Sequence, residues 1–205
     1  MRRSWSVLSL LAILVVALGL ISRHRSPGNP EGAPRNTNTL SVASFPQTPP
    51  VEGERAIVIH KAERALCLYL NGELAAALPI ALGPTPEGHK TRQGDGRTPE
   101  GRYYICTRNP HSAFHLFLGI SYPNTDDAKA ALQGNRISEQ QYRAILEATA
   151  ARRQPPWNTP LGGEIGIHGG GTQSDWTLGC IALEDEAIEE LWQTLRLGDP
   201  VIILP

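Results

Sequence analysis

The sequence is poor in cysteine, methionine and aromatic residues. Its 205 residues include three cysteines, Cys67, Cys106 and Cys180, one methionine and 6% aromatic side chains. The cysteines form neither a CxxC pair nor a dense framework, so we do not expect disulfides to hold the fold together. HExxH spacing is absent as well. We considered His168, Cys180 and His115 as zinc ligands, but without such a motif we expect no metal and no cofactor.

Neither sign of charge dominates the chain. It has 19 basic and 20 acidic residues, and its formal net charge is −1. The basic residues form no run and no stripe with interleaved aromatic side chains, which are the features of nucleic-acid-binding surfaces. We therefore expect no nucleic-acid partner.

The longest uncharged run lies near the N-terminus. Arg2 and Arg3 precede residues 4–22, which are rich in leucine, valine and isoleucine and carry no charge. As a helix its apolar part, Trp5 to Ile21, would span about 26 Å, slightly less than the ~30 Å hydrocarbon core of a bilayer. We interpret residues 1–25 as a signal peptide or a membrane anchor. Both interpretations place the rest of the chain in the periplasm or cell envelope, and the second gives it a membrane partner.

A change of composition separates this segment from the body of the chain. Residues 26–52 are rich in proline, glycine, asparagine and serine and have almost no apolar periodicity. Such a composition predicts a disordered linker. Residues 53–205 remain, and they are enough for one ordinary domain with its own core.

The body begins with patterns typical of β-strands. Apolar residues alternate with others along 66–70, and Asn71-Gly72 then forms the dipeptide that best fits a type I′ hairpin turn. The return strand is predicted to run along 78–82. Further short strands are predicted at 56–59, 103–106, 115–121, 164–167, 180–183 and 201–204.

Helical patterns are confined to the second half of the chain. Ser138 and Gln141 are spaced as a capping box, which predicts a helix over 139–153 before Pro155. A shorter helix is predicted at 126–132. A third begins near Glu184, with apolar residues at helical spacing up to residue 195. The fold class is therefore mostly β with helices (α+β).

The segment from His168 to Cys180, HGGGTQSDWTLGC, is the most informative part of the sequence. It supplies one thiol and one imidazole, which are the parts of a cysteine nucleophile with a histidine base. The two side chains can lie side by side if the strands at 164–167 and 180–183 pair. A neighbouring imidazolium can lower the pKa of a cysteine from ~8.5 to ~3.5–7.5. A backbone carbonyl is sufficient to orient the imidazole.

This combination resembles the catalytic motif of the L,D-transpeptidase (YkuD-type) domain. The likeness extends over about 51–205, and the motifs GDGRTPEG, SYPN and DWTLGCIAL are similar to the YafK-like branch of that family. The resemblance implies a curved mixed sheet or sandwich with packed helices. It also implies that Cys180 is the nucleophile, that His168 is the base and that the Gly169 carbonyl orients it. Backbone amides around Gly179 and Cys180 would form the oxyanion hole.

The activity implied by the resemblance is acyl transfer on peptidoglycan stem peptides. Cys180 would attack the carbonyl of the third stem residue, the L-centre of diaminopimelate, and form a thioester. An amine of a neighbouring stem or of a wall-attached lipoprotein would resolve it, giving a transpeptidase, whereas water would give a hydrolase. The residues alone leave both outcomes open. A catalytically inactive wall-binding module with a membrane tether is the alternative from another class of function.

Two residues depart from the wider family. Many members have Ser-x-Gly-Cys and an arginine two residues after the cysteine, whereas this chain has Thr177 and Ala182. The preference for a particular acyl donor therefore does not transfer from the family.

Other residues are candidates for contact with the substrate. His115, Tyr122 and Trp176 could line the cleft or fill the core, and Gly179 is included because it precedes the nucleophile. We expect Cys67 and Cys106 to be buried free thiols. The remaining histidines are expected on the surface: His24, His60, His89 and His111.

Overall fold

The computed structural model describes residues 39–205. The predicted signal or anchor, and the linker up to residue 38, lie outside the described residues. Within 39–205 no helix has the length and apolar character needed to cross a membrane.

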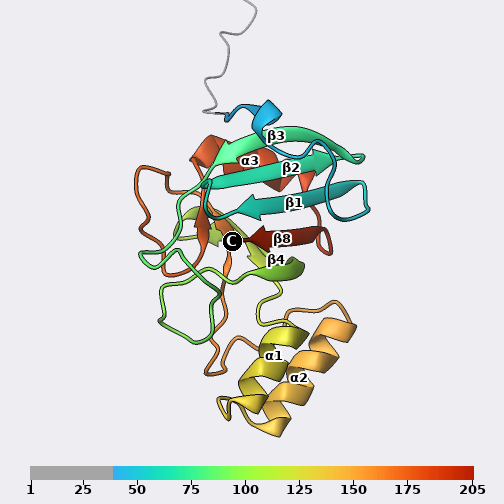
Figure 1. Cartoon of the computed structure of the whole chain (residues 1–205), viewed down its shortest axis with the longest axis vertical. Coiled ribbons are helices and arrows are strands. Elements are labelled where there is room, and N and C mark those ends of the chain that lie inside the picture. The colour runs from blue at the N-terminus through green and yellow to red at the C-terminus, as the bar shows by residue number, and fades with distance from the viewer. Residues whose placement is uncertain (1–38) are drawn as a thin grey trace, which may run out of the picture. The chain divides into compact units, whose positions relative to one another are not determined.

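Eight strands form one mixed sheet that curves until its edges meet. The strands are β1 (Arg55–His60), β2 (Ala65–Leu70), β3 (Glu73–Pro79), β4 (Gly101–Ser112), β5 (His115–Ile120), β6 (Gly166–His168), β7 (Ile181–Ala182) and β8 (Pro200–Leu204). Their order is β3-β2-β1-β8-β4-β5-β6-β7, and Figure 1 shows the first five strands one below another. The pairs β1–β8 and β6–β7 are parallel, and the other pairs are antiparallel.

A backbone bridge joins the two edges of this sheet. Ala81 follows β3 at one edge, and Ala182 lies in β7 at the other. The two residues exchange both backbone hydrogen bonds, each at 2.9 Å. The predicted return strand therefore ends earlier than expected, at Pro79, because the chain turns away to close the sheet. The expected curved mixed sheet is confirmed.

Both faces of strand β1 are buried. Ile57 and Ile59 point into the main core, while Ala56 and Val58 belong to a second cluster on the opposite face, as the two-residue period of a strand requires. The main core also contains apolar residues of helix α3 (Asp185–Thr194), which packs against the sheet.

A segment predicted to be part of the linker covers the second cluster. Residues 39–52 include a short 3₁₀ helix, η1 (Val42–Ser44), and their apolar side chains Leu40, Phe45 and Val51 pack on that face. The Leu40 amide also donates to the Ala77 carbonyl at 2.8 Å. This part of the linker prediction is wrong, because an apolar sheet face is more stable when it is covered.

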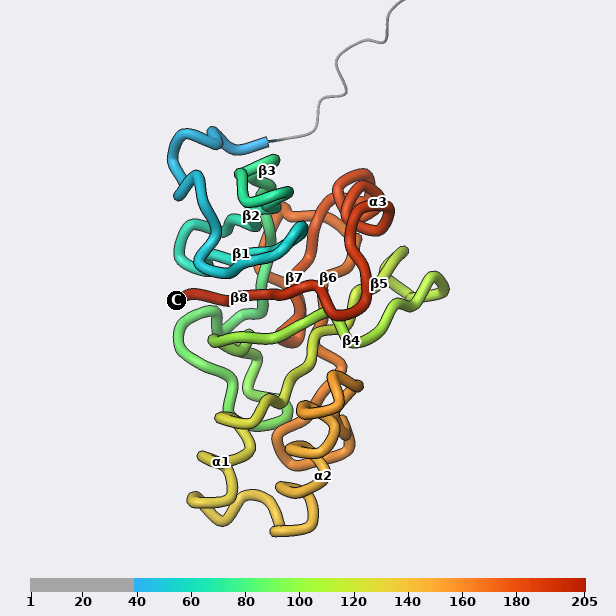
Figure 2. The backbone as a smooth tube through the Cα atoms, turned by 90° about the vertical axis from the view of Figure 1, so that its right-hand side faces the viewer, coloured from blue at the N-terminus to red at the C-terminus, as the bar shows by residue number. Residues whose placement is uncertain are grey.

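The remaining helices form an antiparallel pair at one end of the sheet. They are α1 (Thr125–Gln133) and α2 (Glu139–Ala150), and Figures 1 and 2 show them side by side, below the strands. The predicted capping box is confirmed, because Ser138 accepts from the Gln141 amide at 3.2 Å and Gln141 Oε1 accepts from the Ser138 amide at 2.9 Å. Helix α2 ends three residues before the predicted residue 153.

Local turns also follow the sequence signals. Asn71 and Gly72 have φ values of +53° and +82°, which is the pair of left-handed conformations that a type I′ turn needs. Cys67, Cys106 and Cys180 are all free thiols.

Candidate active site

The pairing of two short strands brings His168 and Cys180 to one cavity. Strand β6 ends at His168 and pairs in parallel with β7, which begins one residue after Cys180; the register places His168 opposite Ala182. Both residues line a cavity of about 610 Å³ together with residues of the β4–β5 hairpin. Cys180 is half-buried. The predicted strand pairing is therefore confirmed, and both residues belong to the lining of one cavity.

The His168 imidazole is held in one tautomer. Its Nδ1 lies 2.6 Å from the Gly169 carbonyl oxygen, and because a carbonyl only accepts, Nδ1 carries the proton. The other nitrogen, Nε2, is left as a proton acceptor. Two aromatic rings fix the plane of the imidazole: Phe114 stacks on it at 4.8 Å, and Trp176 lies edge-on at 5.5 Å.

Burial keeps this imidazole neutral. It lowers the pKa of His168 below its usual value, and the hydrogen bond to Gly169 opposes that shift only in part. His168 is therefore a neutral base at neutral pH, as a general base must be.

The Cys180 thiol is also neutral in the free protein. Its Sγ donates to the Glu164 carbonyl at 3.3 Å. Burial raises the pKa of Cys180 to about 11, although the Gly166 amide and the Lys90 charge act in the lowering direction. The expectation of a thiolate stabilised by an imidazolium is therefore wrong, because burial disfavours the charge on both partners.

The turn before Cys180 is built around the Thr177 hydroxyl. Thr177 Oγ1 donates to the Cys180 carbonyl at 2.8 Å and accepts from the Gly179 amide at 3.2 Å. Gly179 has φ +121°, and a Cβ there would lie 2.5 Å from the Arg97 carbonyl oxygen, so this position requires glycine. Since the Gly179 amide is already engaged, its expected role as an oxyanion-hole donor disagrees with this geometry. Gly179 is buried and shapes the turn instead of lining the cavity.

Replacing Thr177 tests this turn. Thr177→Val leaves the Gly179 amide and the Cys180 carbonyl without a partner, which costs about 1–3 kcal/mol per buried group. We expect a lower melting temperature and activity reduced by about tenfold or more, because Cys180, the predicted nucleophile, is no longer held in place. Thr177→Ser keeps the hydroxyl and should retain both properties. Equal melting curves and rates for the two variants would contradict this role.

Carboxylates anchor the glycine-rich loop between His168 and Cys180. Asp175 accepts from Arg64 at 2.7 Å and from the Leu82 amide at 2.8 Å; burial alone would raise the pKa of Asp175, but these bonds lower it. At the other end of the loop, Asp185 accepts from the Gly170 amide at 2.8 Å. The loop is thus tied both to the sheet and to the start of α3.

His115 does not line the cavity. It has φ +67°, and its Nε2 lies 2.8 Å from Glu189 Oε1 on α3. The prediction that His115 contacts the substrate is therefore wrong in this structure, because the hairpin turn directs it toward α3. Trp176 is not among the lining residues either, although its ring lies edge-on to that of His168.

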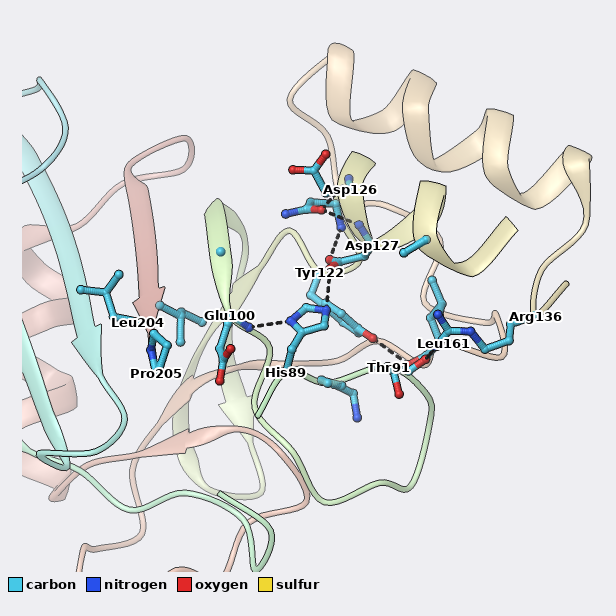
Figure 3. A pocket seen from close by; sticks show the side chains of 15 residues that line it. His89, Thr91, Glu100, Tyr122, Asp126, Asp127, Arg136, Leu161, Leu204 and Pro205 are labelled. Atoms are coloured by element: carbon cyan, nitrogen blue, oxygen red, sulfur yellow. Dashed lines mark hydrogen bonds and ion pairs between the residues drawn. The ribbon is translucent and has the colours of Figure 1, made fainter. Parts of the chain in front are cut away.

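Tyr122 belongs to the core and to a second cavity of about 510 Å³. Figure 3 shows it among the side chains of that cavity, beside His89 and Asp127, and its hydroxyl donates to the Leu161 carbonyl at 3.2 Å. The expected contact of Tyr122 with substrate at Cys180 is not supported. His89 is also less exposed than expected, since it accepts from the Glu100 amide at 2.9 Å and its Nε2 lies 2.9 Å from Asp127.

Comparison with known proteins identifies the family. The model of YkuD, the L,D-transpeptidase catalytic domain, matches residues 54–203. The chain belongs to this family. A search of curated proteins gives no match.

Solved structures share the fold of this YkuD domain. A mutant of the helical cell shape determining protein Pgp2 from Campylobacter jejuni has 20% identity and a TM-score of 0.51, with 77% of this chain and 49% of that chain covered. An L,D-transpeptidase from Xylanimonas cellulosilytica has 16% identity and a TM-score of 0.45, with 79% of this chain and 66% of that chain covered. Bd1075 from Bdellovibrio bacteriovorus has 22% identity and a TM-score of 0.48, with 77% of this chain and 51% of that chain covered. The chain therefore spans about half to two thirds of these structures.

Several residues of the YkuD site carry no signal in the sequence. Phe114, Trp157 and Glu164 all line the cavity. His111 lines it too and is exposed, as expected. Phe114 is positioned by a long-range contact, because its carbonyl accepts from the Gly169 amide at 3.0 Å. Gly163 is a partial sequence signal for Trp157. A Cβ at position 163 would lie 2.3 Å from the Trp157 side chain, so the packing of Trp157 requires a glycine there.

Proposed function

We propose that the chain is a cysteine-dependent acyltransferase that acts on peptidoglycan stem peptides through a Cys180 thioester. Membership of the YkuD family supports an activity of the L,D-transpeptidase type. The observation that carries the residue roles is the arrangement of His168, whose Nδ1 donates to Gly169 while Nε2 remains free to accept in the cavity that Cys180 lines.

In the proposed acylation step, His168 Nε2 accepts the thiol proton as Sγ attacks the carbonyl carbon of the third stem residue. The bond from that carbon to the following residue breaks, and His168 returns the proton to the leaving amine. The Cys180 amide is the proposed oxyanion donor of the turn, since the Gly179 amide is engaged with Thr177.

In the second step, an acceptor amine attacks the thioester and gives a proton to His168, and the thiol leaves with that proton. Water in place of the amine would give hydrolysis. The aromatic side chains of Phe114, Phe117 and Trp157 in the cavity favour transfer to an amine, because apolar walls limit the access of water.

We also propose that the chain acts in the periplasm or cell envelope. Its proposed substrate is the wall, and residues 4–22 have the composition of an export signal or membrane anchor. A stem peptide is the proposed partner in either case, with a wall-attached lipoprotein as a second acceptor.

Incubation of the full chain with isolated sacculi tests this function. We expect mass spectrometry of the digested wall to show new crosslinks through the third stem residue, with release of the fourth. Shortened stems without new crosslinks would instead identify a hydrolase. An unchanged profile in the presence of well-folded protein would favour the inactive wall-binding module.

A further inference from the structure

One acidic residue, which is exposed, lines the cavity around Cys180. Glu164 is the only carboxylate among the lining residues. Among residues 39–205, its carboxylate takes part in no ion pair. The Arg108 guanidinium, which also lines the cavity, donates to the Trp192 carbonyl at 2.6 Å and lies over the Trp192 ring at 4.0 Å. Glu164 thus gives the cavity lining a negative charge that the protein does not neutralise by an ion pair.

The backbone holds Glu164 close to the nucleophile. Its carbonyl accepts from Cys180 Sγ at 3.3 Å, so the two residues are in direct contact. Glu164 has φ +55°, a left-handed conformation that glycine adopts without strain and that costs other residues about 1–2 kcal/mol. A charged side chain therefore occupies a position where the backbone conformation favours glycine.

The negative charge of Glu164 opposes formation of the thiolate. It adds to the effect of burial, which raises the pKa of Cys180, while Gly166 and Lys90 act in the opposite direction. A carboxylate beside a nucleophilic thiol slows acylation unless a positive charge accompanies the substrate. A bound cation would neutralise Glu164 and remove this opposition at the moment of attack.

We propose that Glu164 binds an ammonium group of the acyl donor, next to the carbonyl that Cys180 attacks. This inference rests on the proposed acyl transfer and specifies its donor. The substrate class is a peptide with an amine on the side chain of the residue that is attacked. Diaminopimelate and lysine both provide such an amine, and an uncharged side chain at that position would leave Glu164 unpaired.

Binding to a chain without the nucleophile isolates this contact. We would measure the affinity of the Cys180→Ala chain for a short stem peptide with lysine as its third residue, and for the same peptide with the lysine Nζ acetylated. The lysine peptide should bind about three- to fivefold more tightly, since an ion pair with an exposed carboxylate contributes less than a buried one. Adding Glu164→Gln should reduce the difference to within about twofold, while Glu87→Gln, an exposed residue outside the cavity, should preserve it.

The reactivity of the Cys180 thiol provides a second measurement. Glu164→Gln should raise this reactivity, whereas it should lower the affinity for the lysine peptide. In the chain that retains Cys180, Glu164→Gln should speed alkylation by iodoacetamide at pH 8 by about three- to tenfold, because a nearby negative charge has been removed. A purely structural Glu164 would not combine weaker binding of the lysine peptide with a more reactive thiol. The inference would be overturned if Glu164→Gln discriminated between the two peptides as well as the chain with Glu164 does. It would also be overturned if the chain with Glu164 bound both peptides equally.

Turnover separates this inference from the proposed function. If the lysine peptide binds in a Glu164-dependent way but the unaltered chain never releases the fourth residue, the acyl transfer is wrong and the contact stands. If the chain releases it equally from both peptides and Glu164→Gln changes neither rate, the acyl transfer stands and the contact is wrong.

Discussion

Replacing Cys180 with alanine is expected to abolish acyl transfer and to leave the fold intact. The thiol supplies the sulfur of the proposed thioester, and none of the other residues that line the cavity is a cysteine. We expect a loss of about 10⁴-fold or more in the release of the fourth stem residue. The melting temperature should change little, because Cys180 is half-buried and its main contact is one weak hydrogen bond to Glu164. Mass spectrometry should also lose the acyl adduct on this residue.

Cys106 provides the matched control. It is a free thiol on β4, and burial raises the pKa of Cys106 to about 12, which makes it unreactive. Cys106→Ala should therefore keep the activity at a small cost in stability. Full turnover by Cys180→Ala would refute the thioester mechanism.

The second large effect concerns His168 and the pH dependence of the rate. The neutral imidazole is the proposed base, and burial lowers the pKa of His168. The rate should therefore rise with pH through that lowered pKa, below the usual value of an imidazole, and reach a plateau by neutral pH. It should stay level well into the alkaline range, because the pKa of Cys180 is about 11 and the thiol supplies no thiolate of its own at neutral pH.

Removing the base should change the shape of this profile. In His168→Asn the reaction depends on the small fraction of thiolate, so we expect a rate at neutral pH reduced by about 10²–10⁴-fold. The residual rate should then climb about tenfold per pH unit toward the pKa of the thiol. His115→Gln, which alters the histidine paired with Glu189 outside the cavity, should keep the normal profile. A plateau at neutral pH in His168→Asn would exclude His168 as the base.

The sequence was sufficient for the parts of the site that depend on local patterns. His168 and Cys180 each adjoin a short apolar strand, so pairing of those strands could be expected from the chain alone. The capping box at Ser138 and the turn at Asn71 were likewise predictable, because both depend on residues close together in sequence.

Features that depend on long-range packing were not predictable. The register of β4 and β5 shifts between Asn109 and Ser112, and the hairpin then directs Phe114 onto His168 while His115 turns toward α3. Alternation along the sequence cannot show such a shift. The protonation state of Cys180 was missed for a similar reason, because it depends on how much water the folded chain removes from the sulfur.

The position of β8 has a consequence for how much of the chain the site requires. Residues 200–204 come last among the strands, yet β8 lies between β1 and β4 in the interior of the sheet. A nonsense mutation at residue 200, which removes residues 200–205, would spare His168, Cys180 and every other side chain of the cavity. It would nevertheless separate β1 from β4 and expose the hydrophobic core, so the enzyme should be inactivated by a loss that touches none of its chemistry.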